Sequence, residues 1–239
     1  MELITLKEVD STNNYAKSNL EILSDRTVVR ALRQTSGKGR LNRSWVDLGE
    51  GNLFFSTVLK PSDKFCDIYA NLTQYMSVVL CELLEEYGLA PQIKWPNDVL
   101  IDGKKIAGIL SETVMQGANF KGLILGVGIN LNAEIKDVKR VPDKLVTALS
   151  LELSRKIDAD EFLNKLLDKF FSNYERFLDN GFEFIKSDYI KRACFLDKEV
   201  CVQLINETKH GIAKSVNDSG ELVLEDDGKE FSLTIGDIL

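Results

Sequence analysis

The segment QIKWPNDVLIDGKKIAGILSETV, residues 92–114, carries the strongest folding signal in the chain. It is made of apolar runs that are separated by short polar turns. Asp102-Gly103 stands between two of these runs, and an Asp-Gly pair in that position is a strong hairpin signal. The segment therefore predicts three successive strands: Gln92–Trp95, Val99–Ile101 and Lys105–Val114.

The residues before this segment show both strand and helix patterns. Ser11 and Thr12 are favourable helix N-caps, so a helix should begin there and run to about Leu23. Apolar residues at helical spacing predict a longer helix with one buried face at Phe65–Tyr87. Strands are expected at Leu3–Val9, Thr27–Leu32 and Asn52–Leu59, with a long polar loop at Gln34–Gly51.

The residues after the segment change character near residue 193. The strand Phe120–Asn130 and a polar loop through Asp143 precede helical patterns at Thr147–Leu153, Asp160–Asn180 and Glu183–Arg192. Short strands separated by turns follow, at Glu199–Ile205, His210–Ser215, Leu222–Leu224 and Glu230–Thr234. We expect an α+β fold, with a mixed β-sheet flanked by helices over residues 1–192 and a small C-terminal β-barrel over residues 193–239.

The bulk composition is that of a globular protein. A chain of 239 residues can bury a core, and 44% hydrophobic with 28% charged residues argues against disorder and fibrous repeats. The first twenty residues carry charges and no apolar signal region, so we expect a cytoplasmic protein without a membrane segment. A net charge of −7 argues against nucleic acid as the main partner.

The four cysteines and the one histidine limit metal and nucleophile chemistry. Cys66, Cys81, Cys194 and Cys201 lack the paired spacing of a zinc site, and His210 is the only histidine. We interpret all four cysteines as structural thiols that fill the core. A catalytic Cys–His pair is not expected.

A basic segment with glycines lies inside this acidic chain. Between Arg26 and Val46 there are six basic residues and no acidic one. In its centre, SGKGRLNRSW at residues 36–45, the glycines let backbone N–H groups approach an anion, and arginine forks can chelate carboxylate or phosphate oxygens. It lacks the Gly-Lys-Ser/Thr ending of a Walker A loop. The segment predicts a site for a small anion, with a solvated basic turn as the alternative.

Three further segments carry groups suited to a nucleotide or a carboxylate. Lys94, Asn97 and Asp98 supply a phosphate cation, an amide and a carboxylate for Mg²⁺, although a packed turn would also explain them. Lys105 begins an apolar strand, where a lysine marks either a sheet edge or a cleft for an anion. Glycines inside the apolar run GVGINLN, residues 126–132, suggest a bulge or a ligand close to the backbone.

These four segments, in this order and behind Asp-Ser-Thr-Asn at residues 10–13, resemble the catalytic domain of biotin protein ligases. The resemblance covers essentially the whole chain and implies a class II synthetase-like domain with an SH3-like C-terminal barrel. It implies ATP-dependent activation of biotin to biotinoyl-5′-AMP, followed by transfer to a lysine of a biotin carboxyl carrier protein. Only ten residues precede Ser11, so the short form without a DNA-binding domain is expected.

The resemblance also assigns roles to residues. It makes Lys105 and Arg40 catalytic, and it implies ATP and Mg²⁺ as cofactors, with the metal at Asp98. The implied biotin-binding residues are Ser11, Thr12, Asn13, Gln34, Gly37, Lys38, Gly39, Arg40, Lys105, Gly108 and Gly126. The implied ATP-binding residues are Arg43, Trp45, Lys94, Asn97 and Asn130, with Trp45 packed over the adenine.

The chain departs from the family's loop pattern, Gly-Arg-Gly-Arg-x-Gly-Arg, at two positions. Lys38 replaces the first arginine, which keeps the charge and loses the planar fork. Asn42 replaces the later glycine, and asparagine can still adopt a left-handed conformation. Both departures bear on how the loop closes.

Two alternative functions stay open at this point. A lipoate ligase or octanoyltransferase shares the fold, but an octanoyl relay favours a cysteine beside the cleft lysine, and none lies in these segments. A non-catalytic biotin sensor would keep the pocket without needing Lys94, Asn97 and Asp98. The sequence also leaves open whether the protein is a monomer or a homodimer.

Overall fold

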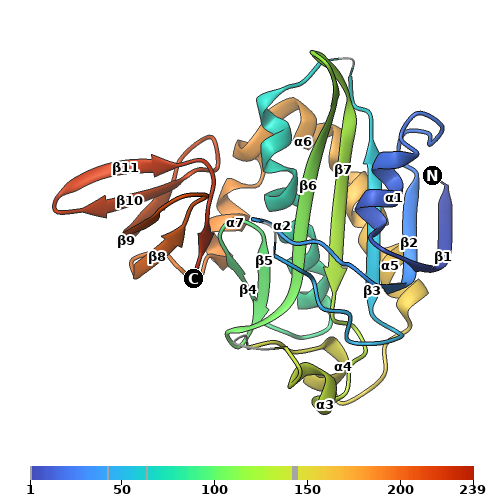
Figure 1. The fold of residues 1–239 in the computed structure, drawn as a ribbon. Coiled ribbons are helices and arrows are strands. Elements are labelled where there is room, and N and C mark those ends of the chain that lie inside the picture. Colours follow the sequence, from blue (N-terminus) through green and yellow to red (C-terminus); the bar gives the residue numbers. More distant parts are fainter. Residues whose placement is uncertain (1, 42, 63, 142–144) are drawn as a thin grey trace. The chain divides into compact units, whose positions relative to one another are not determined.

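The computed structural model describes residues 2–41, 43–62, 64–141 and 145–239 (Figure 1). Asn42, one of the two departures from the loop pattern, lies outside the described residues. The chain forms two compact units: unit 1 comprises Met1–Asp67 and Gly103–Lys165, and unit 2 comprises Ile68–Asp102 and Leu166–Leu239. The expected domain boundary at residues 192 and 193 stays a prediction.

Unit 1 is built on a mixed sheet (Figure 1). β1 pairs in parallel with β2, whereas β2 with β3, β3 with β7, and β7 with β6 are antiparallel. β3 is buried at every position, as expected for an apolar strand with a neighbour on each side. The strands are β1 Leu3–Val9, β2 Val28–Gln34, β3 Leu53–Leu59, β6 Lys104–Gln116 and β7 Asn119–Ile129.

The helix α1, Thr12–Ser18, covers one face of this sheet (Figure 1). Its Ala16 packs in a buried cluster with Val29 and Ile124 from the strands below. The helix was expected to reach about Leu23, and this prediction is wrong in length. The helix ends at Ser18, and in the turn that follows Lys60 Nζ donates hydrogen bonds to the carbonyls of Leu20 and Leu23.

The other elements of unit 1 are short helices and the start of a longer one. A helix expected at Thr147–Leu153 is confirmed only as the single turn α4, Leu149–Glu152, and the expected polar loop contains another turn, α3, Ile135–Val138. The first turn of α5, Ala159–Ser172, carries Asp160, which accepts a hydrogen bond from the buried Arg30 guanidinium.

Unit 2 combines a hairpin with helices. β4, Pro91–Lys94, pairs antiparallel with β5, Asp98–Ile101. The turn that follows, Asp102-Gly103, has φ of +48° and +72°, the left-handed conformation that the Asp-Gly pair predicts. The helical elements are η1 Asp67–Asn71, α2 Leu72–Glu86, the end of α5, α6 Tyr174–Asn180, η2 Gly181–Phe184 and α7 Lys186–Arg192.

The expected long helix at Asp160–Asn180 is divided into α5 and α6. The hydroxyl of Tyr75 donates a hydrogen bond to the carbonyl of Phe170, near the point where α5 ends. The Tyr75 ring also stacks on Phe177 of α6, with centroids 4.6 Å apart and planes 5° apart. Packing on α2 therefore favours the break over the continuous helix that periodicity predicts.

The C-terminal part of unit 2 is an antiparallel sheet with the strand order β11-β10-β9-β8-β12. This arrangement is consistent with the expected barrel-like module, although a closed barrel is not found among the described residues. The final strand was not predicted from the sequence. The strands are β8 Glu199–Gln203, β9 Thr208–Val216, β10 Leu222–Asp226, β11 Lys229–Leu233 and β12 Asp237–Ile238.

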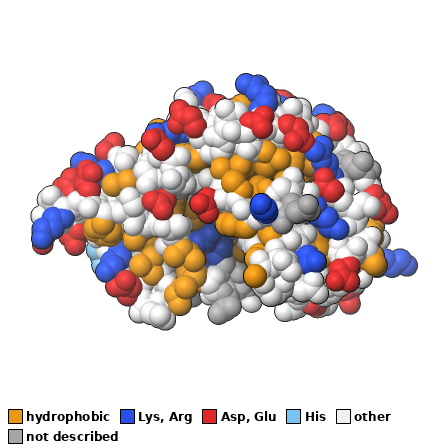
Figure 2. All heavy atoms as spheres, turned by 90° about the horizontal axis from the view of Figure 1, so that it is seen from above, with side chains coloured by type: hydrophobic (Ala, Val, Ile, Leu, Met, Phe, Trp, Pro, Cys, Tyr) orange, Lys and Arg blue, Asp and Glu red, His pale blue; other side chains and the backbone are white. Residues whose placement is uncertain are grey.

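The surface shows a mixture of charges. Acidic and basic side chains are interspersed over the face drawn in Figure 2. Within the part of the chain that the structure describes, no helix has the length and apolar character needed to cross a bilayer.

Candidate functional site

Strands β3, β7 and β6 share a sheet face that packs against α1, and this face is called the floor below. Ile124 on β7 packs in the same cluster as α1, and residues two apart on a strand share a face, so Gly126 and Gly128 belong to this floor. The register then places the neighbours of these glycines on the same face, because directly opposed residues point the same way. The two rows are Ser56, Gly126 and Leu110, and Phe54, Gly128 and Gly108.

The start of α1 brings buried polar side chains onto this floor. Ser11, Thr12 and Asn13 are each less than 5% exposed. Thr12 N donates a hydrogen bond of 2.8 Å to Gln34 Oε1, so the end of β2 meets the first turn of α1. A Cβ added at Gly126 would lie 2.0 Å from Asn13 Oδ1. The floor therefore requires glycine where Asn13 rests on the backbone.

The basic segment forms a narrow hairpin within the expected irregular loop. Gly39 N donates to Arg43 O at 2.7 Å, and Trp45 N donates to Gly37 O at 2.9 Å. Lys38 and Ser44 form an antiparallel bridge between the two arms. A Cβ on Gly37 would lie 2.7 Å from Trp45 O, so the first glycine permits the close approach of the arms. Arg40 lies near the tip.

The second arm of the hairpin places the Trp45 ring on the glycine floor. Added Cβ atoms at Gly128 and Gly108 would lie 2.6 Å from Trp45 Cε2 and 2.8 Å from Trp45 Cζ3. Lys105 Nζ is 5.4 Å from the ring centroid, within the range of a cation–π contact. The indole Nε1 is buried without a hydrogen-bond partner. The structure thus brings Trp45, Lys105 and Gly108 together.

Backbone pairing holds Lys105 and Asn130 in place. Lys105 N donates to Leu145 O at 2.8 Å, and Thr147 N donates to Lys105 O at 3.0 Å. Asn130 is buried just beyond the end of β7, and its N–H donates to Ile106 O at 2.9 Å. Both residues therefore stand on fixed backbone, while the Lys105 side chain extends to Trp45.

Lys94, Asn97 and Asp98 belong to unit 2. Lys94 and Asp98 are directly opposed across the β4–β5 pair, so their side chains lie on one face. Trp95, next to Lys94, is only 2% exposed. Asn97 is also buried. The approach of this group to Arg40 and Lys105 stays a prediction.

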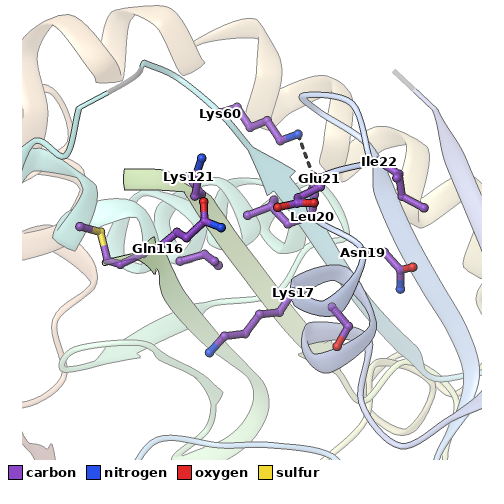
Figure 3. A pocket seen from close by; sticks show the side chains of 11 residues that line it. Lys17, Asn19, Leu20, Glu21, Ile22, Lys60, Gln116 and Lys121 are labelled. Carbon is purple, nitrogen blue, oxygen red and sulfur yellow. Dashed lines mark hydrogen bonds between the residues drawn. The ribbon is translucent and has the colours of Figure 1, made fainter. Parts of the chain in front are cut away.

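One hollow of unit 1 lies away from the predicted residues. It has a volume of about 640 Å³ and lies at the C-terminal end of α1, between the α1–β2 connection and the ends of β6 and β7 (Figure 3). Lys17, Lys60 and Lys121 line it, whereas none of the predicted site residues does. The hollow is lined by lysines, whereas the floor carries glycines and buried polar side chains.

The cysteines depart from the expectation that all fill the core. Cys81 is buried, and burial raises the pKa of its thiol far above the usual range. Cys66 is exposed, whereas Cys194 and Cys201 are partly buried. Cys201 Sγ lies 3.9 Å from His210 Nε2 across the β8–β9 pair, and the expectation that the protein has no catalytic Cys–His pair stays a prediction. The described residues contain no metal-like cluster of three or more His, Cys, Asp or Glu.

Sequence reasoning gave no role to two residues that contact the predicted site. Ser56 Oγ donates to Asn13 Oδ1 at 2.6 Å, and Asn13 Nδ2 donates to Glu112 Oε2 at 2.8 Å. The available signals were weak. Ser56 is a polar residue inside the apolar run LFFSTVL, and Glu112 interrupts a long strand.

Comparisons with known proteins give one consistent result. The model of the biotin/lipoate A/B protein ligase family matches residues 5–130. The bifunctional ligase/repressor BirA of Bacillus subtilis is 32% identical over 200 residues, 83% of this chain and 61% of that protein. The biotin–[acetyl-CoA-carboxylase] ligase of Paracoccus denitrificans is 33% identical over 92% of both chains.

Solved structures show the same relationship. A biotin protein ligase from Aquifex aeolicus, in complex with biotin and ATP, superposes with a TM-score of 0.81 at 30% identity. That match covers 100% of this chain and 97% of the other. The present chain spans about three-fifths of the length of the Bacillus relative. On the family match and the similarity to the Paracoccus ligase, this chain belongs to the biotin/lipoate A/B protein ligase family.

Proposed function

We propose that this protein is a biotin protein ligase that acts on a biotin carboxyl carrier protein. It activates biotin with ATP to biotinoyl-5′-AMP and transfers the biotin to a specific lysine of the carrier. The main support within the molecule is the buried polar group at the start of α1, which lies on a glycine floor that also carries Trp45 and Lys105. The relatives named as biotin–[acetyl-CoA-carboxylase] ligases support the same reaction.

The biotin half of the site is assigned to unit 1. The cyclic urea of biotin needs hydrogen-bond donors and acceptors in a dry pocket, and the buried Ser11, Thr12, Asn13 and the neighbouring Gln34 supply them. Gly108 and Gly126 let Trp45 and Asn13 lie directly against the sheet at the edge of this pocket. Gly37, Lys38, Gly39 and Arg40 face the negative biotin carboxylate in this proposal.

The reaction needs no nucleophile from the enzyme. A biotin carboxylate oxygen attacks the α-phosphorus of ATP, and the bond from that phosphorus to diphosphate breaks. The carrier amine then attacks the acyl carbon, and AMP leaves. The enzyme must align two anions and stabilise negative charge on the α-phosphate. We assign this role to Lys105 and Arg40, and ATP binding to Arg43, Trp45, Lys94, Asn97 and Asn130.

Mg²⁺ fits this site as an ion that accompanies ATP. Nucleotide sites commonly hold Mg²⁺ through one or two carboxylates and the substrate phosphates. Asp98 offers one carboxylate at the start of β5, opposite Lys94. Asp98 would therefore contact the metal, which would neutralise charge on the phosphates, and Lys94 would add a second positive charge.

The partner and location follow from the same proposal. We infer a cytoplasmic enzyme that acts on a carrier domain, with no nucleic acid or membrane as partner. A lipoate ligase remains the main alternative, because the matched family includes lipoate ligases. A non-catalytic biotin sensor is the second alternative.

One assay separates these functions. The protein is incubated with ATP, Mg²⁺, a biotin carboxyl carrier domain and labelled biotin, or with lipoate and a lipoyl domain. Biotin-dependent exchange of labelled diphosphate into ATP, with label on the carrier, supports the ligase. Turnover with lipoate alone favours the first alternative. Biotin binding without exchange favours the sensor.

A further inference from the structure

A continuous chain of polar side chains lies beneath the start of α1. Gln34 Oε1 accepts from Thr12 N at 2.8 Å. Thr12 Oγ1 and Ser56 Oγ are 2.8 Å apart, and Ser56 Oγ is 2.6 Å from Asn13 Oδ1. The chain ends at Glu112, whose Oε2 accepts from Asn13 Nδ2 at 2.8 Å. Ser56 is fully buried, and Thr12 and Asn13 are each 4% exposed, so water cannot easily replace these contacts.

The charge on Glu112 sets the direction of the side-chain hydrogen bonds from Asn13 to Thr12. A carboxylate only accepts hydrogen bonds, so Asn13 must turn its amide nitrogen toward Glu112 and its carbonyl oxygen toward Ser56. A hydroxyl has a single hydrogen, and Ser56 must donate it to that carbonyl. The Ser56 hydrogen is then not available for the 2.8 Å contact with Thr12 Oγ1, so we infer that the Thr12 hydroxyl donates in that contact.

The consequence falls on Thr12. Its hydroxyl hydrogen is used in the contact with Ser56, so the outward side of Thr12 Oγ1 carries only lone pairs. The other Thr12 oxygen contact, to Gln34 Oε1, is 3.3 Å and is the weaker of the two. Thr12 is thus an acceptor toward any ligand on the floor. A cyclic urea offers an N–H to such an acceptor, whereas a dithiolane ring offers none.

We propose that Glu112 and Ser56 are positioning residues that set Thr12 as a hydrogen-bond acceptor for a urea N–H of biotin. This inference rests on the proposed function and adds the source of its selectivity. A site built to receive an N–H rejects an analogue without one, because a buried acceptor is left unpaired. Glu112 acts only through Asn13 and Ser56 and need not contact the ligand.

Lys17 offers a matched control. Its Nζ lies 3.7 Å from Glu112 Oε1, and its side chain is 47% exposed. It also lines the open hollow at the other end of α1 (Figure 3). Exposed ion pairs contribute little, so removing this charge should leave Glu112 bonded to Asn13.

The test measures diphosphate exchange with biotin and with cyclic-carbamate analogues, in which oxygen replaces one urea N–H. In the wild type, the analogue that places oxygen opposite Thr12 should have a KM at least 100-fold above that of biotin. Glu112→Gln has the same shape but can donate or accept, so Asn13 can turn over and release the Thr12 hydrogen. We expect its KM for biotin to rise about tenfold with the KM for ATP unchanged. Its preference for biotin over the carbamate should fall at least fivefold.

Ser56→Ala removes the relay by a second route and should lower the same preference. Lys17→Gln should keep both the KM for biotin and the preference within twofold of the wild type. An unchanged preference in folded Glu112→Gln and Ser56→Ala would overturn the inference. If the proposed function itself is wrong, the wild-type protein will show no biotin-dependent diphosphate exchange. If only this inference is wrong, the wild type will still show that exchange.

Discussion

Unit 1 and unit 2 support their proposed ligand groups in different ways. In unit 1 the side chains themselves are bonded to one another, as in the chain from Thr12 through Ser56 and Asn13. In unit 2 the residues between Lys94 and Asp98 are held by hydrogen bonds to other parts of the unit. Trp95 Nε1 donates to Gly220 O at 3.2 Å, and the Tyr189 hydroxyl donates to Pro96 O at 3.2 Å. Selection of the biotin ring requires side chains with fixed hydrogen-bonding directions. Binding of the ATP phosphates requires charged side chains on a fixed backbone.

The largest effect is expected from Lys105, which combines a hydrogen-bonded backbone with a side-chain contact on the floor. Lys105 stands on paired backbone, as in unit 2, and its amine reaches the Trp45 ring on the floor of unit 1. Lys105→Ala should lower the rate of adenylate formation roughly 10²–10³-fold, by analogy with the loss of one oxyanion donor. Single-turnover kinetics measures this step. A change below tenfold would remove Lys105 from the reacting centre.

The next effect tests whether the floor of unit 1 is as rigid as its bonds indicate. Gly126→Ala places a methyl group on Asn13, which is held by Ser56 and Glu112 and cannot move freely. If the overpacking of about 1–3 kcal/mol falls on the biotin-bound state, the KM for biotin should rise roughly 5- to 150-fold. The KM for ATP should stay constant.

A double-mutant cycle gives the control for the floor. In an Asn13→Ala background the methyl group at residue 126 no longer meets the side-chain oxygen. Gly126→Ala should then add less than threefold, since contacting residues are not additive. Equal effects in both backgrounds would show that the glycine serves the ligand directly.

The sequence predicts the local elements of both units, whereas contacts between residues far apart in the chain were missed. The strands of unit 1 were predicted within a few residues, because apolar alternation and the Asp-Gly turn are local signals. Glu112 was not recognised as a site residue, because its bond to Asn13 joins positions 99 residues apart and depends on the register of β6. The break between α5 and α6 was missed for the same reason, since it arises from packing on Tyr75.

A smaller effect is expected from the hydrogen bond between Trp95 and Gly220 in unit 2. Gly220 O accepts from both Trp95 Nε1 and Gln74 Nε2, and Gly220 has φ of +80° with an added Cβ 2.4 Å from Asn71 Nδ2. The turn that ends at this glycine therefore fixes the residue next to Lys94. Trp95→Phe removes the N–H together with part of the buried indole ring and should raise the KM for ATP about threefold to tenfold.

The KM for biotin should not change in Trp95→Phe, because the chain beneath α1 lies in unit 1. Lys186→Gln is the control, since it removes a contact to Asp218 in the same turn without touching Trp95. It should change either KM less than twofold. A rise in the KM for biotin alone would contradict the division of roles between the units.

The smallest effect concerns the charges that hold the helices of unit 2. Arg192 donates to both carboxylate oxygens of Glu85, at 2.7 and 2.8 Å, and this hydrogen bonding holds the pKa of Glu85 below its ordinary value of 4.5. One turn earlier on α2, burial raises the pKa of Glu82, although Arg192 and Lys169 oppose the shift and Asp188 adds to it. The two glutamates should therefore contribute to acid unfolding with opposite signs.

For Glu85, the folded state binds its proton more weakly than the unfolded state, so its stabilisation is present above pH 4.5 and is lost as the pH falls through the lowered pKa. For Glu82, burial penalises the charged form, and protonation relieves that penalty as the pH falls. Urea unfolding at pH 7 and pH 4 should show a smaller loss of stability in Glu85→Gln than in wild type, and a larger loss in Glu82→Gln. Each difference should stay below about 1 kcal/mol, because the Glu85 side chain is 40% exposed and solvent screens the pair. The same sign in both variants would show that Arg192 does not set the pH response of this unit.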